Sequence, residues 1–401
     1  MSRFVTVVRT VAAGIFAVGL AACEADDIAF GAPEMTTVTV GDMHSCALSE
    51  TGAAYCWGDG LSGQLGTGRA ESSSYAVRVA GSRSFSSIDA GGRHTCALTA
   101  AGQAYCWGEN DTGQLGTGDR EQALEPQPVE TTERFASLSA GWEHTCAITT
   151  DGRAFCWGHG AYGELGDGVS PGTATSPRPV LTALRFTQIS AGGRHTCAVA
   201  LGGAGYCWGA NEVAQLGIGT AGAQHDVPAR VDGTFSFSDI SAGWNHSCGV
   251  SPQRIAYCWG ENAYGEMGSG WEWLAGEPAQ PSPGEVTSYG EIMFVQISAG
   301  KGFTCGRRDQ GTVYCWGKGT HGQLGNGLAR NFLTAQWVKG GPGRLDVFSV
   351  DIFQKVDAGS DSHACAAAVD GRVFCWGNGA SGQLGNGEWL SMIALPVLAA
   401  R

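Results

Sequence analysis

Hydrophobic and polar residues alternate along much of the chain with the two-residue period of a β-strand. The stretch HTCALTAAGQAYCWG, residues 94–108, contains two such strands on either side of a short turn that ends at Gly102. Glycine suits the last position of a three-residue hairpin loop, because it adopts the left-handed conformation at no steric cost. We therefore expect an antiparallel hairpin in which Thr99 pairs with Gln103.

This register places Cys96 directly opposite Cys106. Opposed Cα atoms in an antiparallel pair lie roughly 4.5–5.5 Å apart, which is within the reach of a disulfide bond. On the other face of the hairpin, Trp107 lies opposite Thr95. One face is then tied by sulfur, and the other packs a large aromatic ring over a small residue and against a neighbouring element.

The hairpin occurs seven times, so internal repetition decides the architecture. Its first cysteines are 50 to 60 residues apart, and the second cysteine always follows ten residues after the first. Strand candidates such as RFASLSAG precede the hairpin, and a glycine turn such as GQLGTG with a segment such as PQPVE follows it. Four short strands in roughly fifty residues, repeated seven times, predict an all-β fold, a seven-bladed β-propeller.

The ends of the chain distinguish a closed ring from the alternative, an open solenoid. The first unit begins with MTTVTVG and lacks a preceding proline-valine strand, whereas the chain finishes with IALPVLAA, a proline-valine strand that no hairpin follows. We expect this C-terminal strand to complete the first blade and to close the ring. The propeller then occupies residues 35–401.

Three motifs together resemble the regulator of chromosome condensation repeat family: the glycine pair before HTCAL, the YCWG tetrad and the GQLGTG turn, over roughly residues 36–399. The resemblance implies a seven-bladed propeller, and the paired cysteines resemble the secreted bacterial branch of the family. Repeat 6 departs from the pattern, with Phe303 in place of histidine and Arg307 in place of an aliphatic residue. Repeat 7 has one extra residue before Cys365.

The N-terminal segment, residues 1–22, is typical of a lipoprotein signal peptide. Arg3 and Arg9 form a positive region, and the apolar stretch over residues 11–22 is too short to span a bilayer of roughly 30 Å. The alternative is a buried strand or helix at the start of the fold. The stretch LAAC, residues 20–23, resembles the lipobox of bacterial lipoproteins, which implies lipidation of Cys23 and a short tether over residues 23–34.

The cysteine count agrees with a lipidated Cys23, and the net charge bears on the kind of partner. Fifteen cysteines minus Cys23 leave fourteen, which is seven pairs. The formal net charge is −13, or −15 without Arg3 and Arg9, and the lack of a basic run argues against nucleic-acid binding. We expect a monomer in the cell envelope that contacts the membrane only through its lipid. By the same lipoprotein resemblance, an aspartate directly after the lipidated cysteine is linked to inner-membrane retention. This chain has Glu24 at that position, which favours the outer membrane or cell surface.

The fourteen remaining cysteines could bind metal, but zinc sites usually show ligand spacings of two to four residues. An exported protein favours disulfides instead. The expected pairs are Cys46–Cys56, Cys96–Cys106, Cys146–Cys156, Cys197–Cys207, Cys248–Cys258, Cys305–Cys315 and Cys365–Cys375.

Six histidines share one register, two residues before the first cysteine: His44, His94, His144, His195, His246 and His363. A metal site is one interpretation, but each histidine belongs to a different blade and lies on a buried strand face. We expect structural histidines that hydrogen-bond a backbone loop. The sequence contains no recognisable catalytic motif, and no helix follows its glycine turns as a phosphate loop requires. We therefore expect no enzyme activity, no cofactor and no metal.

Departures from the repeat are the candidate binding residues, because function sits on loops held by a rigid scaffold. Two insertions stand out: residues 268–291, with Trp271 and Trp273, and residues 328–351, with Trp337. In the loops before two hairpins, Trp142 and Trp244 replace glycine. Exposed tryptophan is a typical binding anchor; the alternative is that the rings in the insertions cover the loops' own backbone.

These observations favour a non-catalytic, lipid-anchored, extracytoplasmic scaffold that binds a protein or a glycan through propeller loops. Three alternatives stay open. The first is a purely structural envelope protein, and the second is an enzyme with a site in the central channel. The third follows from the resemblance, since the family's eukaryotic founder exchanges guanine nucleotides on a small GTPase. The sequence indicates neither the partner nor the propeller face that binds it.

Overall fold

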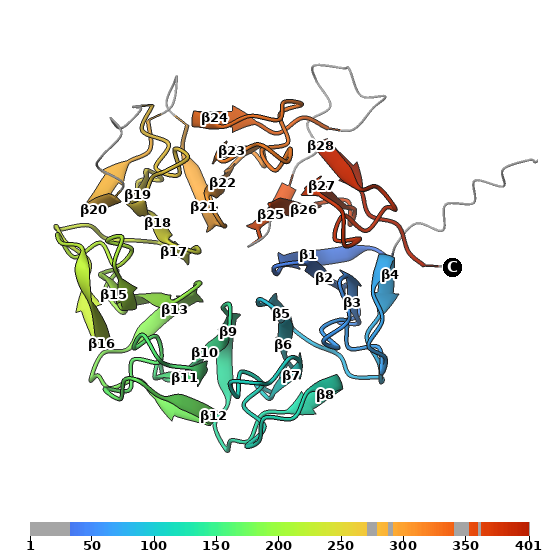
Figure 1. The fold of residues 1–401 in the computed structure, drawn as a ribbon, viewed down its shortest axis with the longest axis horizontal. Coiled ribbons are helices and arrows are strands. Elements are labelled where there is room, and N and C mark those ends of the chain that lie inside the picture. Colours follow the sequence, from blue (N-terminus) through green and yellow to red (C-terminus); the bar gives the residue numbers. More distant parts are fainter. Residues whose placement is uncertain (1–32, 271–278, 288–291, 341–352, 360–361, 401) are drawn as a thin grey trace, which may run out of the picture.

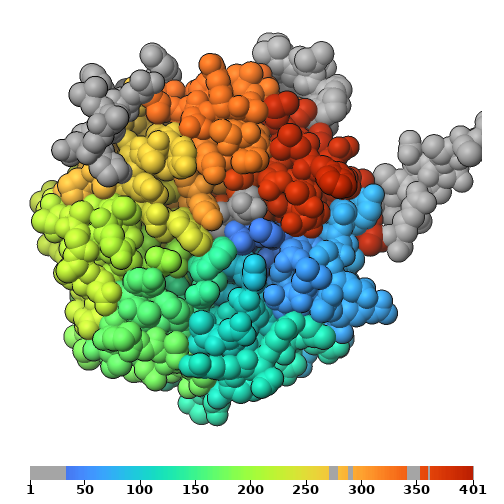
Figure 2. Space-filling view, in the orientation of Figure 1, coloured from blue at the N-terminus to red at the C-terminus, as the bar shows by residue number. Residues whose placement is uncertain are grey.

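A computed structural model describes residues 33–270, 279–287, 292–340, 353–359 and 362–400. The strands form seven antiparallel sheets of four strands each, arranged in sequence order around a central axis (Figure 1). In the space-filling view the seven blades pack side by side around the centre (Figure 2). The expected all-β, seven-bladed propeller is confirmed.

Each blade consists of four consecutive strands, and their order in the sheet leads from the central channel to the rim. The inner strands are β1 (Met35–Val40), β5 (Ser87–Ala90), β9 (Phe135–Ala140), β13 (Phe186–Ala191), β17 (Asp239–Ala242), β21 (Phe294–Ala299) and β25 (Phe353–Ala358). The second strands are β2 (His44–Ser49), β6 (His94–Leu98), β10 (His144–Thr149), β14 (His195–Ala200), β18 (His246–Val250), β22 (Phe303–Arg308) and β26 (His363–Ala368).

The third and fourth strands complete each blade toward the rim. The third strands are β3 (Ala54–Gly58), β7 (Ala104–Gly108), β11 (Ala154–His159), β15 (Gly205–Asn211), β19 (Ala256–Glu261), β23 (Val313–Gly317) and β27 (Val373–Asn378). The outer strands are β4 (Ser73–Arg78), β8 (Ala123–Pro128), β12 (Thr173–Pro179), β16 (Gly222–Arg230), β20 (Ala279–Glu285), β24 (Phe332–Trp337) and β28 (Leu390–Pro396). Strands β20 and β24 lie inside the segments predicted as insertions, so part of each segment is an ordinary outer strand.

The central hairpin of each blade has the predicted register. In blade 2 the amide of Thr99 donates to the carbonyl of Gln103 at 3.0 Å, and Gly102 closes the turn with a φ of 74°. Cys96 lies opposite Cys106, with their Cα atoms 4.1 Å apart. All seven expected disulfides are present, and every one of these cysteines is fully buried.

The other face of each hairpin packs on the preceding blade, as expected. Trp107 of blade 2 is fully buried, and its indole Nε1–H donates to the carbonyl of Gln64, in the glycine turn of blade 1, at 2.9 Å. Gly66 belongs to that turn, and a Cβ there would lie 2.7 Å from the indole nitrogen. The equivalent tryptophan makes the same bond in all seven blades, at 2.8 to 3.0 Å.

The six histidines of the shared register also bridge blades, but their partner differs from the one expected. His94 Nε2 lies 2.9 Å from the hydroxyl of Thr145 in the next blade, rather than against a backbone loop. That hydroxyl donates its own proton to the carbonyl of Gln114, so the histidine donates to it through Nε2–H. Burial lowers the pKa of His94 to about 3, and the ring is therefore neutral.

One interface lacks this bond on both sides. Phe303 of blade 6 replaces the histidine, and Ala364 of blade 7 replaces the hydroxyl residue. Both are fully buried. The two departures compensate each other, because an apolar ring facing a methyl group leaves no polar atom without a partner.

The inner strands are tied into a closed ring. The side chain of the penultimate residue of each inner strand accepts a hydrogen bond from a backbone amide of the next blade at all seven interfaces, at 2.8 to 3.1 Å. The C-terminal strand β28 is the outer strand of blade 7 and does not complete the first blade, because blade 1 has its own four strands. Residues beyond β28 still reach blade 1, where Ala399 pairs with Ala76.

Candidate functional site

The central channel opens on one face of the ring between the loops that join the first and second strands of the blades. This upper mouth encloses a cavity of about 140 Å³, lined by the ends of the inner strands. The loops between third and fourth strands open on the same face, because strand direction alternates within an antiparallel sheet.

Two tryptophans and a lysine meet at the upper mouth. The rings of Trp142 and Trp244 pack edge to face, with their centroids 4.5 Å apart and their planes at 83°. Lys301 Nζ lies 4.2 Å from the Trp244 centroid and 5.8 Å from the Trp142 centroid. We call Trp142, Trp244 and Lys301 the mouth cluster. A cation over an aromatic face is attracted by the ring quadrupole, so the cluster is held together in advance of any ligand.

The fold fixes the backbone of each tryptophan of the cluster. The amide of Trp142 donates to the carbonyl of Gly192, and the amide of Trp244 donates to the carbonyl of Gly300, both at 3.1 Å. The cluster spans blades 3, 5 and 6, and blade 4 between the two tryptophans carries Gly193 at the same register. A Cβ at Gly193 would lie 3.2 Å from the Trp244 ring, so the missing side chain gives the two rings room to meet.

Two further pairs of a cation and an aromatic ring lie on this face. Arg194 of blade 4 covers Tyr162 of blade 3 at 4.6 Å, and Lys318 of blade 6 lies 5.4 Å from the ring of Tyr264 in blade 5. Tyr264 is 40% exposed. With the mouth cluster they form an arc of aromatic and basic side chains over blades 3 to 6.

Two buried glutamates lie beneath this face, and their partners differ. Glu164 of blade 3 contacts His159, and this hydrogen bond raises the pKa of His159. In blade 5 the equivalent pair is Glu266 and Glu261. Burial, with a contribution from Glu261, raises the pKa of Glu266 to about 8, so this carboxyl group carries a proton at neutral pH.

The structure brings together only some of the residues predicted for binding. Trp142 and Trp244 form one cluster, whereas Trp337 lies on the outer strand β24 with 51% of its surface exposed. Trp271, Trp273 and Cys23 lie outside the described residues. Whether the residues of the two insertions bind anything stays a prediction.

Sequence reasoning missed Lys301 and Trp389. Lys301 follows the Ala-Gly pair at the register of Trp142 and Trp244, so aligning the repeats at that pair would have found it. Trp389 directly precedes β28 and is 79% exposed. It follows the GQLGNG turn, where the equivalent positions of other repeats carry no aromatic residue.

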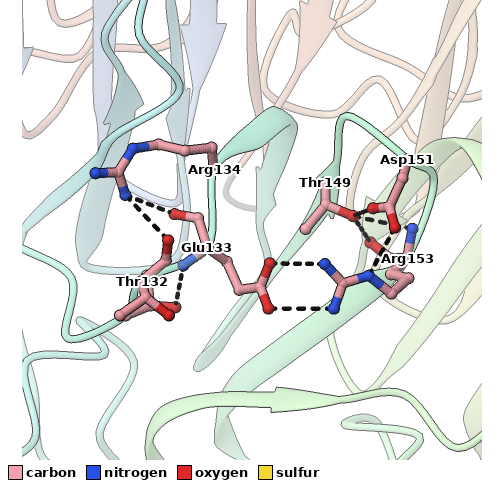
Figure 3. A network of polar contacts seen from close by, with 7 residues as sticks. Thr132, Glu133, Arg134, Thr149, Asp151 and Arg153 are labelled. Carbon is pink, nitrogen blue, oxygen red and sulfur yellow. Dashed lines mark hydrogen bonds and ion pairs between the residues drawn. The ribbon is translucent and has the colours of Figure 1, made fainter.

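A different polar network, drawn in Figure 3, lies at the turn between β10 and β11, which is on the face opposite the mouth cluster. The guanidinium of Arg153 donates to both carboxylate oxygens of Glu133, at 3.1 and 2.8 Å, and to Asp151 at 2.9 Å. It links the hairpin turn of blade 3 to the chain entering that blade. The side chains of Arg153, Glu133 and Asp151 are partly solvent-exposed, and we interpret the network as a surface clamp of modest stabilising effect.

The described residues contain no group of three or more histidine, cysteine, aspartate or glutamate side chains placed to hold a metal ion. Nor, within that part of the chain, is there a helix with the length and apolar character needed to cross a membrane.

Two family profiles match the sequence. The profile of the RCC1-like domain covers residues 24–351, and that of the Regulator of chromosome condensation (RCC1) repeat covers residues 353–383. Similar curated proteins include the human probable E3 ubiquitin-protein ligase HERC6, 30% identical over 54% of this chain and 21% of the relative. Another is the ultraviolet-B receptor UVR8 of Arabidopsis thaliana, 33% identical over 37% of this chain and 33% of the relative. The chain thus spans a fifth to a third of these relatives.

Solved structures show the same fold over most of the chain. Prp20p from Saccharomyces cerevisiae superposes with a TM-score of 0.74 at 21% identity, covering 88% of this chain and 87% of that one. Human WBSCR16 superposes with a TM-score of 0.70 at 19% identity, covering 82% of this chain and 85% of that one. At this level of identity the likeness concerns the fold alone.

Proposed function

The chain belongs to the RCC1-like domain family, and from this premise we propose that it is a non-catalytic scaffold that binds a protein partner through the mouth cluster. The observation that carries the proposal is the contact of Trp142 and Trp244 with Lys301 at the open end of the channel. The register that holds these three residues carries glycine in blades 2 and 4. Blades 2 and 4 therefore form without a side chain at this register, so the fold does not require a large residue there.

The chemistry of the cluster suits a protein interface. Tryptophan is over-represented among the residues that dominate binding energy, so Trp142 and Trp244 are the expected anchors, and Lys301 holds their rings in place. The backbone hydrogen bonds of Trp142 and Trp244 reduce the conformational entropy that binding would cost. Tyr264 and Tyr162, with their basic neighbours, extend the same chemistry outward. The partner is then expected to carry a protruding segment that inserts at the channel axis.

We further propose that the protein is exported and anchored to the cell envelope by lipid on Cys23, as a monomer at the outer membrane or cell surface. Seven disulfides support this proposal, because such bonds persist in oxidising compartments and are rare in the cytosol. The test is lipid labelling of the wild type and of Cys23→Ala, with alkylation of the denatured, unreduced protein. Labelling confined to the wild type and an absence of free thiols are expected; an unlabelled product with reactive thiols would overturn the proposal.

The similar proteins support protein binding as a general role, but they do not indicate a particular partner. Prp20p has binding properties toward Gsp1p and histones, and another structure shows Kap60 bound to the same protein. These partners belong to that propeller, and they support protein binding here only as a class. Because the chain spans a fifth of HERC6, we do not transfer the probable ligase activity of that protein.

A photo-crosslinking amino acid in living cells tests the proposal. It is placed at Glu212, an exposed position on the upper face, and in a second strain at Ala101, an exposed turn residue on the opposite face. We expect capture of one protein from position 212, and loss of that capture when Trp142 and Trp244 are both changed to glycine. Capture from position 101 alone, capture that the double variant leaves unchanged, or binding of a glycan only would overturn it.

A further inference from the structure

The channel has a second opening on the face opposite the mouth cluster. This lower mouth is a hollow of about 420 Å³ between blades 1, 5, 6 and 7, lined among others by Thr37, Asp239, Gln296, Arg307 and Lys355. These residues lie near the beginnings of the inner strands, at the opposite end from the mouth cluster. The proposed protein-binding role makes no use of them.

Arg307 and Lys355 are the two residues at this opening whose type differs from that of the equivalent residues in the other blades. The residues at the register of Arg307 in the other six blades are buried and apolar: Leu48, Leu98, Ile148, Val199, Val250 and Ala367. The residues at the register of Lys355 are neutral or acidic: Thr37, Ser87, Ser137, Gln188, Asp239 and Gln296. A basic side chain therefore occurs once at each register, and the two occur in adjacent blades.

Neither cation has a carboxylate partner among the described residues. Arg307 donates through Nε to Gln296 Oε1 and through Nη1 to the carbonyl of Arg308, both at the long distance of 3.4 Å. Its Nη2 group has no protein acceptor in that part of the chain. Burial lowers the pKa of Arg307, with Asp239 acting in the opposite direction, which is the expected result for a half-buried cation without a close counter-ion.

The acidic groups near this opening already have donors of their own. Asp239 accepts from Gln188 Nε2 at 2.5 Å and from the amide of Ile297 at 2.7 Å. Deeper in the channel, Asp89 accepts from Thr39 Oγ1 at 2.7 Å and from the amide of Ala140 at 2.8 Å. Lys355 acts on Asp89 through its charge without a hydrogen bond. The charged donors that remain free at the opening are therefore those of Arg307 and Lys355.

We propose that the lower mouth binds a carboxylate group, with Arg307 donating through its open guanidinium edge and Lys355 supplying the second positive charge. A planar carboxylate matches the fork of a guanidinium, and such charge-assisted bonds are the stronger hydrogen bonds of proteins. A singly charged group suits the site better than a phosphate dianion, because Asp239 already acts on Arg307 and offsets part of the positive charge of the two basic side chains. The hydroxyl of Thr37 lines the same hollow and offers a further donor.

The carboxylate could belong to a small free acid or to an acidic side chain of a protein. Titration calorimetry at fixed ionic strength separates the two sources with two probes. The first probe is succinate, and the second is an end-capped Gly-Ser peptide with one glutamate. Inorganic phosphate serves as the comparison anion. The variants are Arg307→Leu, which has the residue of blades 1 and 2, and Lys355→Ser, which has the residue of blades 2 and 3. Arg120→Leu, at an exposed position, removes a charge elsewhere and is the matched control.

We expect saturable binding of at least one carboxylate probe, with the tighter probe identifying the source, and weaker binding of phosphate. Arg307→Leu should weaken binding by at least about tenfold, Lys355→Ser by a smaller factor, and Arg120→Leu not at all. Changing Trp142 and Trp244 to glycine should leave this affinity unchanged, so failure of the protein-binding proposal would not affect the result. Absence of saturable binding by either probe, or equal affinity of Arg307→Leu and the wild type, would overturn the carboxylate site.

Discussion

The backbone amide of Val40 donates a hydrogen bond of 2.9 Å to the carboxylate of Asp357, although 317 residues separate the two in the chain. This bond joins the first blade to the last. It is the same contact, between a side chain of one inner strand and an amide of the next, that occurs at the other six interfaces. The propeller is therefore closed at its channel wall as well as at its rim, where Ala399 pairs with Ala76. Closure makes the upper and lower mouths rigid openings of one channel.

Removing this carboxylate should weaken the closing interface. Asp357→Ala leaves the buried amide of Val40 without an acceptor, and we expect a loss of about 1–3 kcal/mol in the free energy of unfolding. Asp357→Ser keeps an acceptor of the kind that blades 3 to 6 use and should lose less. Urea denaturation of the three proteins measures the difference. Equal stability of the alanine variant and the wild type would show that closure does not depend on this bond.

The hydrogen bond between His94 and Thr145 allows a test that copies a natural interface. Thr145→Ala should cost about 1–3 kcal/mol, because it leaves the Nε2–H of His94 buried without an acceptor. The double variant His94→Phe, Thr145→Ala reproduces the Phe303 and Ala364 pair and should recover most of that loss. A double-mutant cycle by urea denaturation measures the coupling. Additive losses would contradict the interpretation of the sixth interface as a compensated pair.

The buried histidines should make stability fall as the pH falls. Burial lowers the pKa of His94 to about 3 in the folded protein, whereas an unfolded histidine titrates near its ordinary value of 6.5. Below pH 6.5 the unfolded chain therefore binds a proton that the folded chain excludes, and stability is lost on acidification. Relative to the wild type, the double variant should regain on the order of 1–2 kcal/mol between pH 7 and pH 5. Parallel stability curves for the two proteins would refute a neutral His94.

Glu266 should make the stability fall as the pH rises, which is the opposite of the effect of the buried histidines. Its folded pKa is raised to about 8 from an ordinary 4.5, so its contribution is fully present below pH 4.5 and is lost as the pH rises through 8. Glu266→Gln restores the residue of five other blades, and we expect its stability gain over the wild type to grow by roughly 1.4 kcal/mol per pH unit across this window. Glu164→Gln is the contrasting variant: it removes the partner that raises the pKa of His159, so we expect a loss rather than a gain relative to the wild type, largest at low pH. A gain independent of pH would contradict the protonated state of Glu266.

The sequence predicted correctly those contacts whose two residues lie close together in the chain. Gly102 and the ten-residue cysteine spacing determine the hairpin register, because both act within one turn. The partner of His94 could not be inferred in this way, since Thr145 lies 51 residues away and only the packing of blades brings the two together. The strand IALPV was assigned to the wrong blade because its hydrophobic pattern suits the outer strand of either neighbour.

The candidate site shows the same limit. Trp142 and Trp244 could be selected because they replace glycine in a repeated motif. That they touch depends on Gly193 in the intervening blade, a residue that appears ordinary in the sequence. Lys301 occupies the same repeated position and could have been selected in the same way, whereas the meeting of Lys355 with Arg307 in one hollow depends on how blades 6 and 7 pack.

The affinity of the captured partner for variants of the mouth cluster tests the proposed function most directly. The dissociation constant should be measured for the wild type, for the variant with glycine at both Trp142 and Trp244, and for Trp337→Ala as an exposed tryptophan outside the cluster. We expect the glycine variant to bind at least about tenfold more weakly, while Trp337→Ala binds as the wild type does. Equal affinity of the glycine variant and the wild type would contradict the binding role assigned to the upper mouth.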